Sequence, residues 1–240
     1  MENLETLTLG EIVKQDYRAA AVFEKYALDF CCMGTQNFSD ACKTVNIEPS
    51  IIMNELQKLA HERNDSTDFD SWPLDLLVDY IYKRHHAYIE EKTPLLNQYL
   101  DKISRVHGAR HPELLQLRDI FREIGGELTV HLKKEELMLF PYIKKLEHAR
   151  NQDGAISKPL FSSVNDMVHM MKDDHSAEGE KFKTIVALTN NYAVPADGCN
   201  TYKVTYELLQ EYEKDLHIHI HLENNILFPK AVQLDEQLNY

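Results

Sequence analysis

Two stretches of the sequence, HLKKEELMLFP at 131–141 and HIHLENNILFP at 219–229, place the same residue types at the same spacing, 88 residues apart. In each stretch a His is followed four residues later by a Glu, and a Phe-Pro pair closes the pattern. Residues four apart share one face of a helix. Because imidazole and carboxylate groups both bind metal ions, the repeat indicates a metal site built from two helices. The pairs are His131 with Glu135 and His219 with Glu223.

One further His precedes each copy by a similar distance. His86 lies 45 residues before His131, and His175 lies 44 residues before His219. Four imidazoles and two carboxylates exceed the four ligands of a tetrahedral zinc, but they suit two metals that each take two His while both Glu bridge between them. The sequence therefore predicts a centre of two non-haem irons. An added oxo or hydroxo bridge would leave a coordination position on each iron for a small molecule.

Other assignments stay open at the level of sequence. His85 adjoins His86 and is an alternative ligand, and His217 with His221 forms a competing pair on another face of the last helix. The His and Glu side chains could also neutralise one another in a metal-free hydrogen-bond network, since a buried carboxylate without partners is costly. The internal repeat favours the pairs named above over the competing pair.

The candidate ligands are expected to lie on four long helices, near 74–105, 113–146, 161–190 and 201–231. Helical patterning runs through nearly the whole chain, and eight glycines leave little turn chemistry for a sheet. Short polar breaks join the helices, which favours antiparallel neighbours. The predicted fold is all-α, an antiparallel four-helix bundle preceded by a small helical domain.

The N-terminal part of the chain carries two adjacent cysteines, Cys31 and Cys32. We expect residues 1–61 to form the small helical domain, 62–72 a polar linker and 73–240 the bundle. Adjacent cysteines close only a strained disulfide ring, so these two are candidate redox or transfer thiols, with a buried structural pair as the alternative. One hypothesis is that the linker lets the domain present the thiols to the metal site or to a client protein.

The chain carries 26 Lys and Arg against 39 Asp and Glu, and the net charge of −13 disfavours nucleic acid and anionic lipid as partners. The sequence contains neither a run of about 18 apolar residues nor a leader-like N-terminus. The protein is expected to be cytoplasmic, without a nucleic-acid or membrane partner, and to be a monomer or homodimer.

Several other side chains are expected to be structural. Tyr82 should line the core, His107 should lie at a helix end as a solvated or capping residue, and Cys42 and Cys199 should be incidental. The apolar row through the first repeated stretch is expected to continue to Met138. Each Phe-Pro pair is expected to mark a kink or a helix end, because proline removes a backbone hydrogen bond.

Five segments together resemble one protein family: DFCCMG at 29–34, RHH at 84–86, HLKKEELMLFP, DHSAEGE at 174–180 and HLENNILFPKA at 221–231. With these motifs the chain resembles the Repair of Iron Centres family of hemerythrin-like di-iron proteins along nearly its whole length. The resemblance implies a hemerythrin-like bundle. It implies as iron ligands the same six residues: His86, His131, Glu135, His175, His219 and Glu223.

The resemblance also implies a role in restoring iron-sulfur clusters damaged by nitric oxide or oxidative stress. Iron donation or nitric oxide chemistry at the di-iron centre would serve that role, with damaged iron-sulfur proteins as clients and nitric oxide or dioxygen as small ligands. Enzymatic activity of a nitric oxide reductase kind stays open. The alternative is a carrier or sensor that binds dioxygen or nitric oxide without turnover. Met33 and His85 depart from the family's pattern, where Gly and an aromatic residue are expected.

Overall fold

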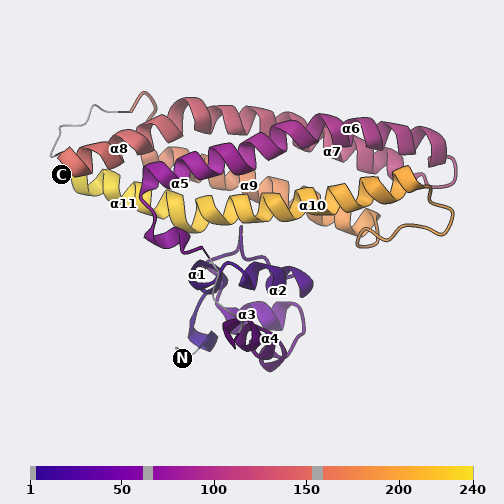
Figure 1. Ribbon diagram of the computed structural model, residues 1–240, viewed down its shortest axis with the longest axis horizontal. Coiled ribbons are helices and arrows are strands. Elements are labelled where there is room, and N and C mark those ends of the chain that lie inside the picture. Colours follow the sequence, from indigo (N-terminus) through magenta and orange to yellow (C-terminus); the bar gives the residue numbers. More distant parts are fainter. Residues whose placement is uncertain (1–3, 62–66, 153–158, 240) are drawn as a thin grey trace.

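The computed structural model describes residues 4–61, 67–152 and 159–239, and within these ranges the chain forms helices and no strand (Figure 1). An isolated β-bridge pairs Thr8 with Asn37. Four long helical rods lie alongside one another, and the small N-terminal helices lie against them at mid-length. The prediction of an all-α bundle preceded by a small helical domain is confirmed.

The four rods run antiparallel along the long axis of the molecule (Figure 1). In chain order they are α5 (Leu74–Tyr80), η3 (Ile81–His86) and α6 (Ala87–His107); α7 (Glu113–Lys134), η4 (Glu135–Leu139) and α8 (Phe140–Gln152); α9 (Val164–Leu188); and α10 (Asn200–Leu222), η5 (Glu223–Leu227) and α11 (Phe228–Asn239).

The rods differ in length from the predicted helices. The second continues to Gln152 and the fourth to Asn239, so of the two outcomes expected at Phe-Pro, a kink or a helix end, the helix end is wrong. In both rods the N–H of the Phe donates to the carbonyl of a Glu five residues back, across a wide π-helical turn. Because the regular four-residue ladder is already interrupted there, the missing N–H of the next residue, proline, does not stop the helix.

These π-helical turns occur in three of the four rods, and each begins or ends at a candidate ligand. η3 ends at His86, η4 begins at Glu135 and η5 begins at Glu223. A π turn adds one residue and so rotates the following residues by about 100° relative to a continuous α-helix. Leu139 is consequently buried while Met138 is 38% exposed, and the prediction that Met138 continues the inward row is wrong.

The apolar core of the bundle falls into two separate clusters. One fills the end built from α6, the body of α7, the C-terminal half of α9 and α10, and includes Phe121, Phe182 and Tyr212. The other fills the opposite end, built from α5, α8, the first half of α9 and α11, and includes Ile143 and Phe228. In every rod the candidate ligands lie at the border between the residues of one cluster and those of the other. A polar layer thus divides the core at mid-length.

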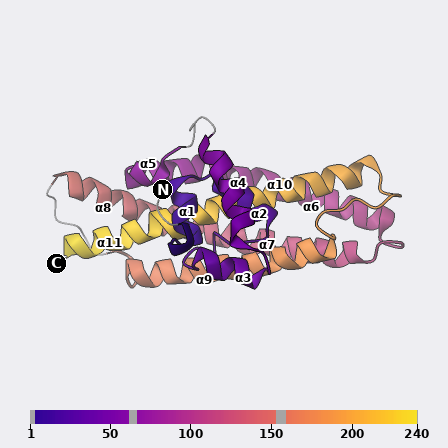
Figure 2. The ribbon, with the colours of Figure 1, turned by 90° about the horizontal axis from the view of Figure 1, so that it is seen from below.

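The N-terminal domain consists of short helices whose starts are visible in the sequence. Thr8 and Glu11 form a capping box at the start of α1, and Pro49 occupies the first turn of α4. Viewed from below, these helices cover the middle of the bundle (Figure 2). Their apolar residues belong to the same cluster as α6 and α10. The elements are η1 (Leu4–Thr6), α1 (Leu9–Gln15), α2 (Ala19–Lys25), α3 (Phe38–Thr44) and α4 (Pro49–His61).

Two glycines let this domain lie close against the fourth rod. The N–H of Gly10 donates to the carbonyl of Gly34 at 2.8 Å within the domain, and the side chain of Asn225 on the rod donates to the carbonyl of Phe30 at 3.1 Å. A Cβ on Gly34 would lie 2.8 Å from that same carbonyl and would collide with Asn225. Only glycine fits at position 34, whereas Met33, in place of the expected Gly, is half exposed and unconstrained.

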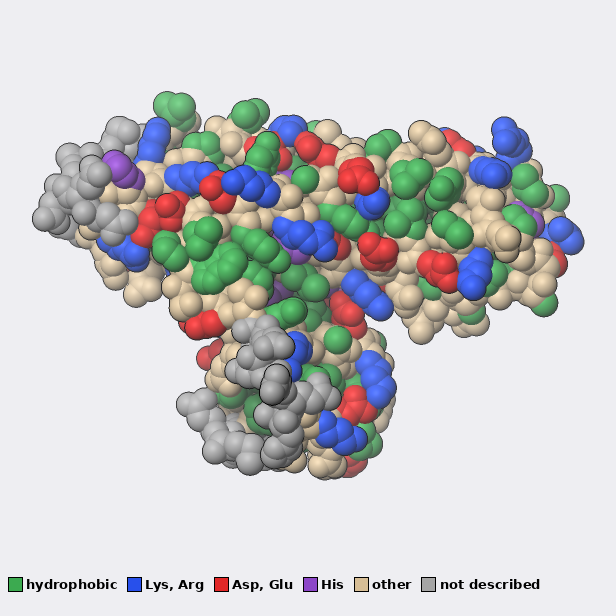
Figure 3. Space-filling view, in the orientation of Figure 1, with side chains coloured by type: hydrophobic (Ala, Val, Ile, Leu, Met, Phe, Trp, Pro, Cys, Tyr) green, Lys and Arg blue, Asp and Glu red, His purple; other side chains and the backbone are tan. Residues whose placement is uncertain are grey.

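The predicted linker is packed where the structure describes it. Residues 62–66 lie outside the described residues, but 67–72 include the short helix η2 (Phe69–Ser71). Phe69 is buried, with its ring 4.9 Å from that of Trp72, and Asp70 pairs with Lys14 and Lys230. Figure 3 shows hydrophobic side chains near the junction of domain and bundle, and charges of both signs spread over the rest of this face. No helix among the described residues has the length and apolar character needed to cross a membrane.

Candidate metal centre

Six ionisable side chains meet in the polar layer at the middle of the bundle. All are at least 97% buried, which is rare for carboxylates and imidazoles without a compensating partner. They come from all four rods, and the π turns bring the two carboxylates and one imidazole inward. The six are those predicted from the repeat and its preceding histidines: His86, His131, Glu135, His175, His219 and Glu223.

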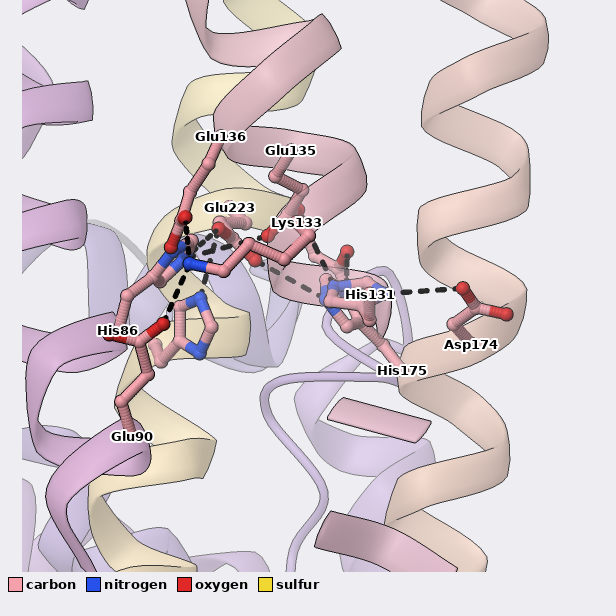
Figure 4. Close-up of polar contacts among 11 residues, drawn as sticks. His86, Glu90, His131, Lys133, Glu135, Glu136, Asp174, His175 and Glu223 are labelled. Carbon is pink, nitrogen blue, oxygen red and sulfur yellow. Dashed lines mark hydrogen bonds and ion pairs between the residues drawn. The ribbon is translucent and has the colours of Figure 1, made fainter. Parts of the chain in front are cut away.

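The six side chains form two groups of four that share both carboxylates (Figure 4). Within each group the ligand atoms lie within 4.8 Å of one another, which is the spread of donors around a single ion. The alternative ligand His85 belongs to neither group. The groups are His86, Glu135, His219 and Glu223, and His131, Glu135, His175 and Glu223.

Each carboxylate divides its two oxygens between the groups. Glu135 lies with Oε2 3.5 Å from His86 Nε2 and with Oε1 3.5 Å from His131 Nε2. Glu223 lies with Oε1 2.9 Å from His219 Nε2 and with Oε2 3.2 Å from His175 Nε2. A carboxylate placed in this way is able to donate one oxygen to each of two ions. The arrangement therefore suits a pair of metals rather than one.

Most of the donor atoms lack hydrogen-bond partners among the described residues, the exceptions being Nε2 of His131 and of His175, which lie 3.0 Å apart. The atoms without partners are both oxygens of Glu135 and of Glu223, and Nε2 of His86 and His219. An uncompensated buried charge costs several kcal/mol, on the order of 3–5 when a partner is missing. Cations coordinated by these atoms would remove that cost, so the residues present fit a di-metal group. Imidazole and carboxylate donors together suit iron.

In the absence of metal, protons balance the layer. Although burial lowers the pKa of His131, the carboxylates of Glu135 and Asp174 outweigh burial and raise it to about 10. Burial likewise raises the pKa of Glu223, but the imidazoles of His219 and His175 hold it well below its usual value. The layer thus pairs imidazolium with carboxylate, and a metal that binds there must displace protons.

Polar side chains outside the layer orient the imidazole rings through Nδ1, the ring nitrogen that does not face the layer. Nδ1 of His86 lies 3.0 Å from Glu136, Nδ1 of His131 lies 3.2 Å from Asp174, and Nδ1 of His175 lies 2.9 Å from Asn224 (Figure 4). Such partners fix the ring and leave Nε2 directed at the metal. Sequence reasoning did not single them out. The available signal is that Glu136, Asp174 and Asn224 each adjoin a candidate ligand in the sequence.

The repeated phenylalanines also contact the layer. The ring of Phe140 stacks on that of His86 at 5.2 Å, and the ring of Phe228 lies parallel to that of His175 at 6.1 Å. Both phenylalanines are buried. They close the layer on the side of the second apolar cluster and exclude water from it. This contact gives the Phe of each Phe-Pro pair a role that the kink prediction did not include.

The alternative histidines have other partners. Nδ1 of His85 lies 3.0 Å from Asp215, and its ring stacks on that of His219 at 5.8 Å, so it supports the layer from outside. His217 and His221 face the N-terminal domain, where both rings contact Phe30. The competing pair therefore belongs to the contact between domain and bundle.

Two structural expectations are wrong. Tyr82 is 47% exposed rather than in the core, because it lies within the π turn η3 and faces outward. His107 is buried rather than solvated, because its Nε2 lies 3.3 Å from Cys199 Sγ at the start of α10. Cys199 is exposed and Cys42 is buried in the core of the N-terminal domain.

The adjacent cysteines lie directly beside a candidate ligand. Cys32 Sγ lies 3.5 Å from the backbone oxygen of His175. Asn224, whose side-chain oxygen accepts from the His175 ring, donates through its nitrogen to the carbonyl of Cys31 at 3.2 Å. Both thiols are free. The loop that carries them is thus joined to the metal layer through one asparagine.

Two family models match the chain. Residues 77–231 match the hemerythrin HHE cation-binding domain, and residues 5–60 match ScdA_N, a domain of unknown function (DUF542). The first match includes all six residues of the layer, and the second includes both adjacent cysteines.

The chain is also similar to curated proteins along most of its length. It is 34% identical over 226 residues to the iron-sulfur cluster repair protein YtfE of Yersinia pestis (strain Pestoides F), which covers 94% of this chain and 96% of the relative. It is 31% identical over 228 residues to the iron-sulfur cluster repair protein ScdA of Staphylococcus epidermidis (strain ATCC 12228 / FDA PCI 1200), covering 93% and 96%. The ScdA of Staphylococcus haemolyticus (strain JCSC1435) is 29% identical over 222 residues, covering 92% and 96%.

Proposed function

Because the chain belongs to the hemerythrin-like family of ScdA and YtfE iron-sulfur cluster repair proteins, we propose that it holds two non-haem irons and serves the repair of damaged iron-sulfur clusters. The observation that carries this proposal is the pair of four-residue groups that share both carboxylates. That arrangement suits two ions held close together. The apolar clusters on either side of the layer exclude water from it.

In the proposed centre, His86 and His219 would hold one ion and His131 and His175 would hold the other, while Glu135 and Glu223 would supply oxygens to both. Bound iron would supply one-electron chemistry and a coordination position for nitric oxide or dioxygen.

The chain's own residues set the conditions for iron exchange. Glu136, Asp174 and Asn224 orient the rings and keep Nε2 available. In the metal-free layer protons would take the place of iron, because the neighbouring carboxylates outweigh burial and raise the pKa of His86 and of His131. Protons thus replace the positive charge of the metal, so the carboxylates of the metal-free layer keep a compensating charge.

The clients in this proposal are cytoplasmic proteins whose iron-sulfur clusters have been damaged by nitric oxide or oxidants. Cys31 and Cys32 are proposed as redox or transfer thiols in that process, since they lie against the backbone of His175. Replacing both with Ser is expected to leave the iron content of the bundle intact while lowering repair. Unchanged repair would remove the thiols from the mechanism.

The experiment that tests the proposal measures iron content, visible absorption and transfer to a damaged cluster. Wild-type protein is expected to hold about two irons per chain, with absorption from the bridged pair. A variant with Glu135→Ala and Glu223→Ala is expected to lose both irons and the absorption. Loaded wild type should restore activity to a purified enzyme whose cluster has been damaged, and the variant should not.

Glu180→Ala provides a matched control, because Glu180 is an exposed Glu on α9 whose carboxylate pairs with Lys183. It is expected to bind and transfer iron as wild type does. A single zinc, or equal metal content in wild type and the double variant, would contradict the di-iron centre. Iron that binds nitric oxide or dioxygen reversibly but never reaches the damaged cluster would instead identify a carrier or sensor.

A further inference from the structure

A second group of metal-binding side chains lies outside the bundle layer. Asp29, Cys31 and Cys32 offer one carboxylate oxygen and two sulfurs that all lie within 4.8 Å of one another. They belong to the loop that follows α2, on the face of the N-terminal domain that contacts the bundle. None of the six residues of the layer takes part in this group.

The distances within the group match the edges of a tetrahedral site. The two sulfurs lie 3.7 Å apart, and Cys31 Sγ lies 3.5 Å from Asp29 Oδ1. Two thiolates at about 2.3 Å from one ion are separated by about 3.8 Å in tetrahedral geometry, and a thiolate and a carboxylate oxygen by about 3.6 Å. The loop therefore holds three donors near the positions that a single ion requires, with no ion needed to gather them.

The backbone fixes the carboxylate in this arrangement. Asp29 Oδ1 accepts hydrogen bonds from the N–H groups of Cys32 and Met33, at 2.9 and 3.3 Å. Oδ2 lies 3.5 Å from Lys183 Nζ on α9. Although burial raises the pKa of Asp29, these donors and the ammonium outweigh burial and hold the carboxyl below its usual pKa. One permanent negative charge therefore stands beside the two thiols.

The Cys31 thiol is a poor nucleophile without a metal. The neighbouring Cys32 thiol, burial and the Asp29 carboxylate together raise the pKa of Cys31 well above its ordinary value. A divalent cation reverses each of these electrostatic causes, because it attracts both sulfurs and the carboxylate. The closeness of the two thiols and the carboxylate therefore opposes a free thiolate but favours thiolates bound to a metal.

The site also has room for a further ligand. Asp29, Cys31 and Cys32 line a cavity of about 640 Å³ between the N-terminal domain, α9 and α10. Lys183 on α9 and His217 on α10 also line this cavity. Three protein donors leave one position of a tetrahedral ion for water or for a small molecule in the cavity.

We propose that Asp29, Cys31 and Cys32 form a second metal site, which binds one thiophilic divalent cation such as Fe(II) or Zn(II). Binding displaces the two thiol protons to solvent, including the proton that Cys32 directs at the carbonyl of His175. This site is independent of the function proposed for the bundle layer, since it requires no iron there.

The test uses Co(II), because cobalt bound by thiolate has a sulfur-to-metal charge-transfer band that cobalt bound by nitrogen and oxygen lacks. The full-length chain would be titrated anaerobically in a Cys199→Ser background, which removes the exposed cysteine beside His107. We expect the band to rise to one equivalent of thiolate-bound cobalt per chain. The bundle layer contains no sulfur donor and contributes nothing to this band.

Three variants locate the site. Cys31→Ser and Cys32→Ser, made singly, should each abolish or halve the band, and Asp29→Asn should weaken cobalt binding by at least about tenfold. Cys42→Ala is the matched control, since Cys42 is a buried thiol of the same domain outside the group, and it should leave the band unchanged. A missing band in the starting protein, or a band that keeps its full intensity in the Cys31→Ser and Cys32→Ser variants, would overturn the proposal.

A second measurement covers the case in which a variant does not fold. Alkylation of Cys31 and Cys32 is followed by mass spectrometry, with and without Zn(II), with both cysteines in place. Zinc is expected to slow alkylation at both positions by at least about tenfold. Equal rates with and without zinc would count against the site regardless of how the variants behave.

Discussion

Asn224 makes two contacts that few single side chains could replace. Its oxygen faces the ring of His175 and its nitrogen donates to the carbonyl of Cys31. Removing a polar partner of a metal-ligating histidine typically lowers metal affinity by about 10–100-fold. We therefore expect Asn224→Ala to weaken iron binding within that range, measured by competition with a chelator of known affinity.

Asn225→Ala is the control for this prediction. Asn225 lies next in the chain and also donates to the N-terminal loop, at the carbonyl of Phe30, but the structure pairs it with His221 rather than with a candidate ligand. It is expected to loosen the domain contact but to weaken iron binding much less than Asn224→Ala does, because the ring of His175 keeps its partner. Equal losses in the two variants would show that the effect passes through domain docking rather than through the ring of His175.

Cys199 is expected to be the most reactive thiol of the chain at neutral pH. The backbone N–H of Tyr202 and the imidazole of His107 lower the pKa of the Cys199 thiol to about 7. Alkylation at this position should therefore rise with pH around a midpoint near 7. His107→Gln should move the midpoint toward the ordinary value of about 8.5, as read by mass spectrometry across a pH series. The same midpoint in both proteins would contradict the role of His107.

At the residue scale, the sequence was informative where chemistry and helical spacing coincide. The 88-residue repeat was enough to single out His131 and His219 with their glutamates, and the structure places all four in one layer. Glu136, Asp174 and Asn224, the partners of the ligand rings, were not predicted. A single polar residue next to a ligand forms no periodic pattern that would distinguish it from a solvent-exposed residue. The contact of His107 with Cys199 joins residues 92 apart, which no local pattern encodes.

At the scale of the helical element, the π turns decide which side chains reach the layer. Deleting Leu137, which is 74% exposed within η4, would restore a regular α-helix and rotate everything after it by about 100°. Glu135 and Phe140 could then no longer face the layer together. We expect the deletion variant to lose iron while keeping its helical circular dichroism.

Leu137→Ala serves as the control for the deletion, because it shortens the same side chain without changing the register. It should bind iron as wild type does. Full iron content in the deletion variant would show that the helix can absorb the lost residue elsewhere and that the π turn is not required.

The elements themselves were largely predictable and their ends were not. Helical periodicity and polar breaks located the four rods, because amphipathic patterning over twenty or more residues is a strong signal. The expected ends near 146 and 231 fell short of Gln152 and Asn239, the first because the polar stretch from 147 onward was taken as a break between helices. A π turn has no compositional signature, so the outward turn of Met138 could not be predicted from the sequence.

At the scale of the whole molecule, docking of the N-terminal domain depends on one glycine. A Cβ on Gly34 would collide with Asn225 and with the carbonyl of Phe30. Gly34→Ala is expected to separate the domain from the bundle, which faster hydrogen exchange in residues 29–37 and easier proteolysis between domain and bundle would report. The domain boundaries predicted at 61 and 73 stay a prediction that the same proteolysis would test.

Gly126→Ala is the comparison for this variant. Position 126 lies within α7, and a Cβ there meets no described atom within 4 Å. It should raise the free energy of unfolding by about 0.5–1 kcal/mol, because alanine favours a helix over glycine. Similar behaviour of the two alanine variants would mean that the contact at Gly34 does not hold the domain in place.

The double contact of Asn224 also has a thermodynamic consequence. If docking of the N-terminal domain tightens iron binding through this side chain by some factor, iron must tighten docking by that same factor, because coupling between two equilibria is reciprocal. Loss of iron then weakens docking of the N-terminal domain, and undocking of the domain weakens iron binding. A client that binds the N-terminal loop and pulls the domain from the bundle would in this way lower the affinity of the layer for iron without contacting the metal.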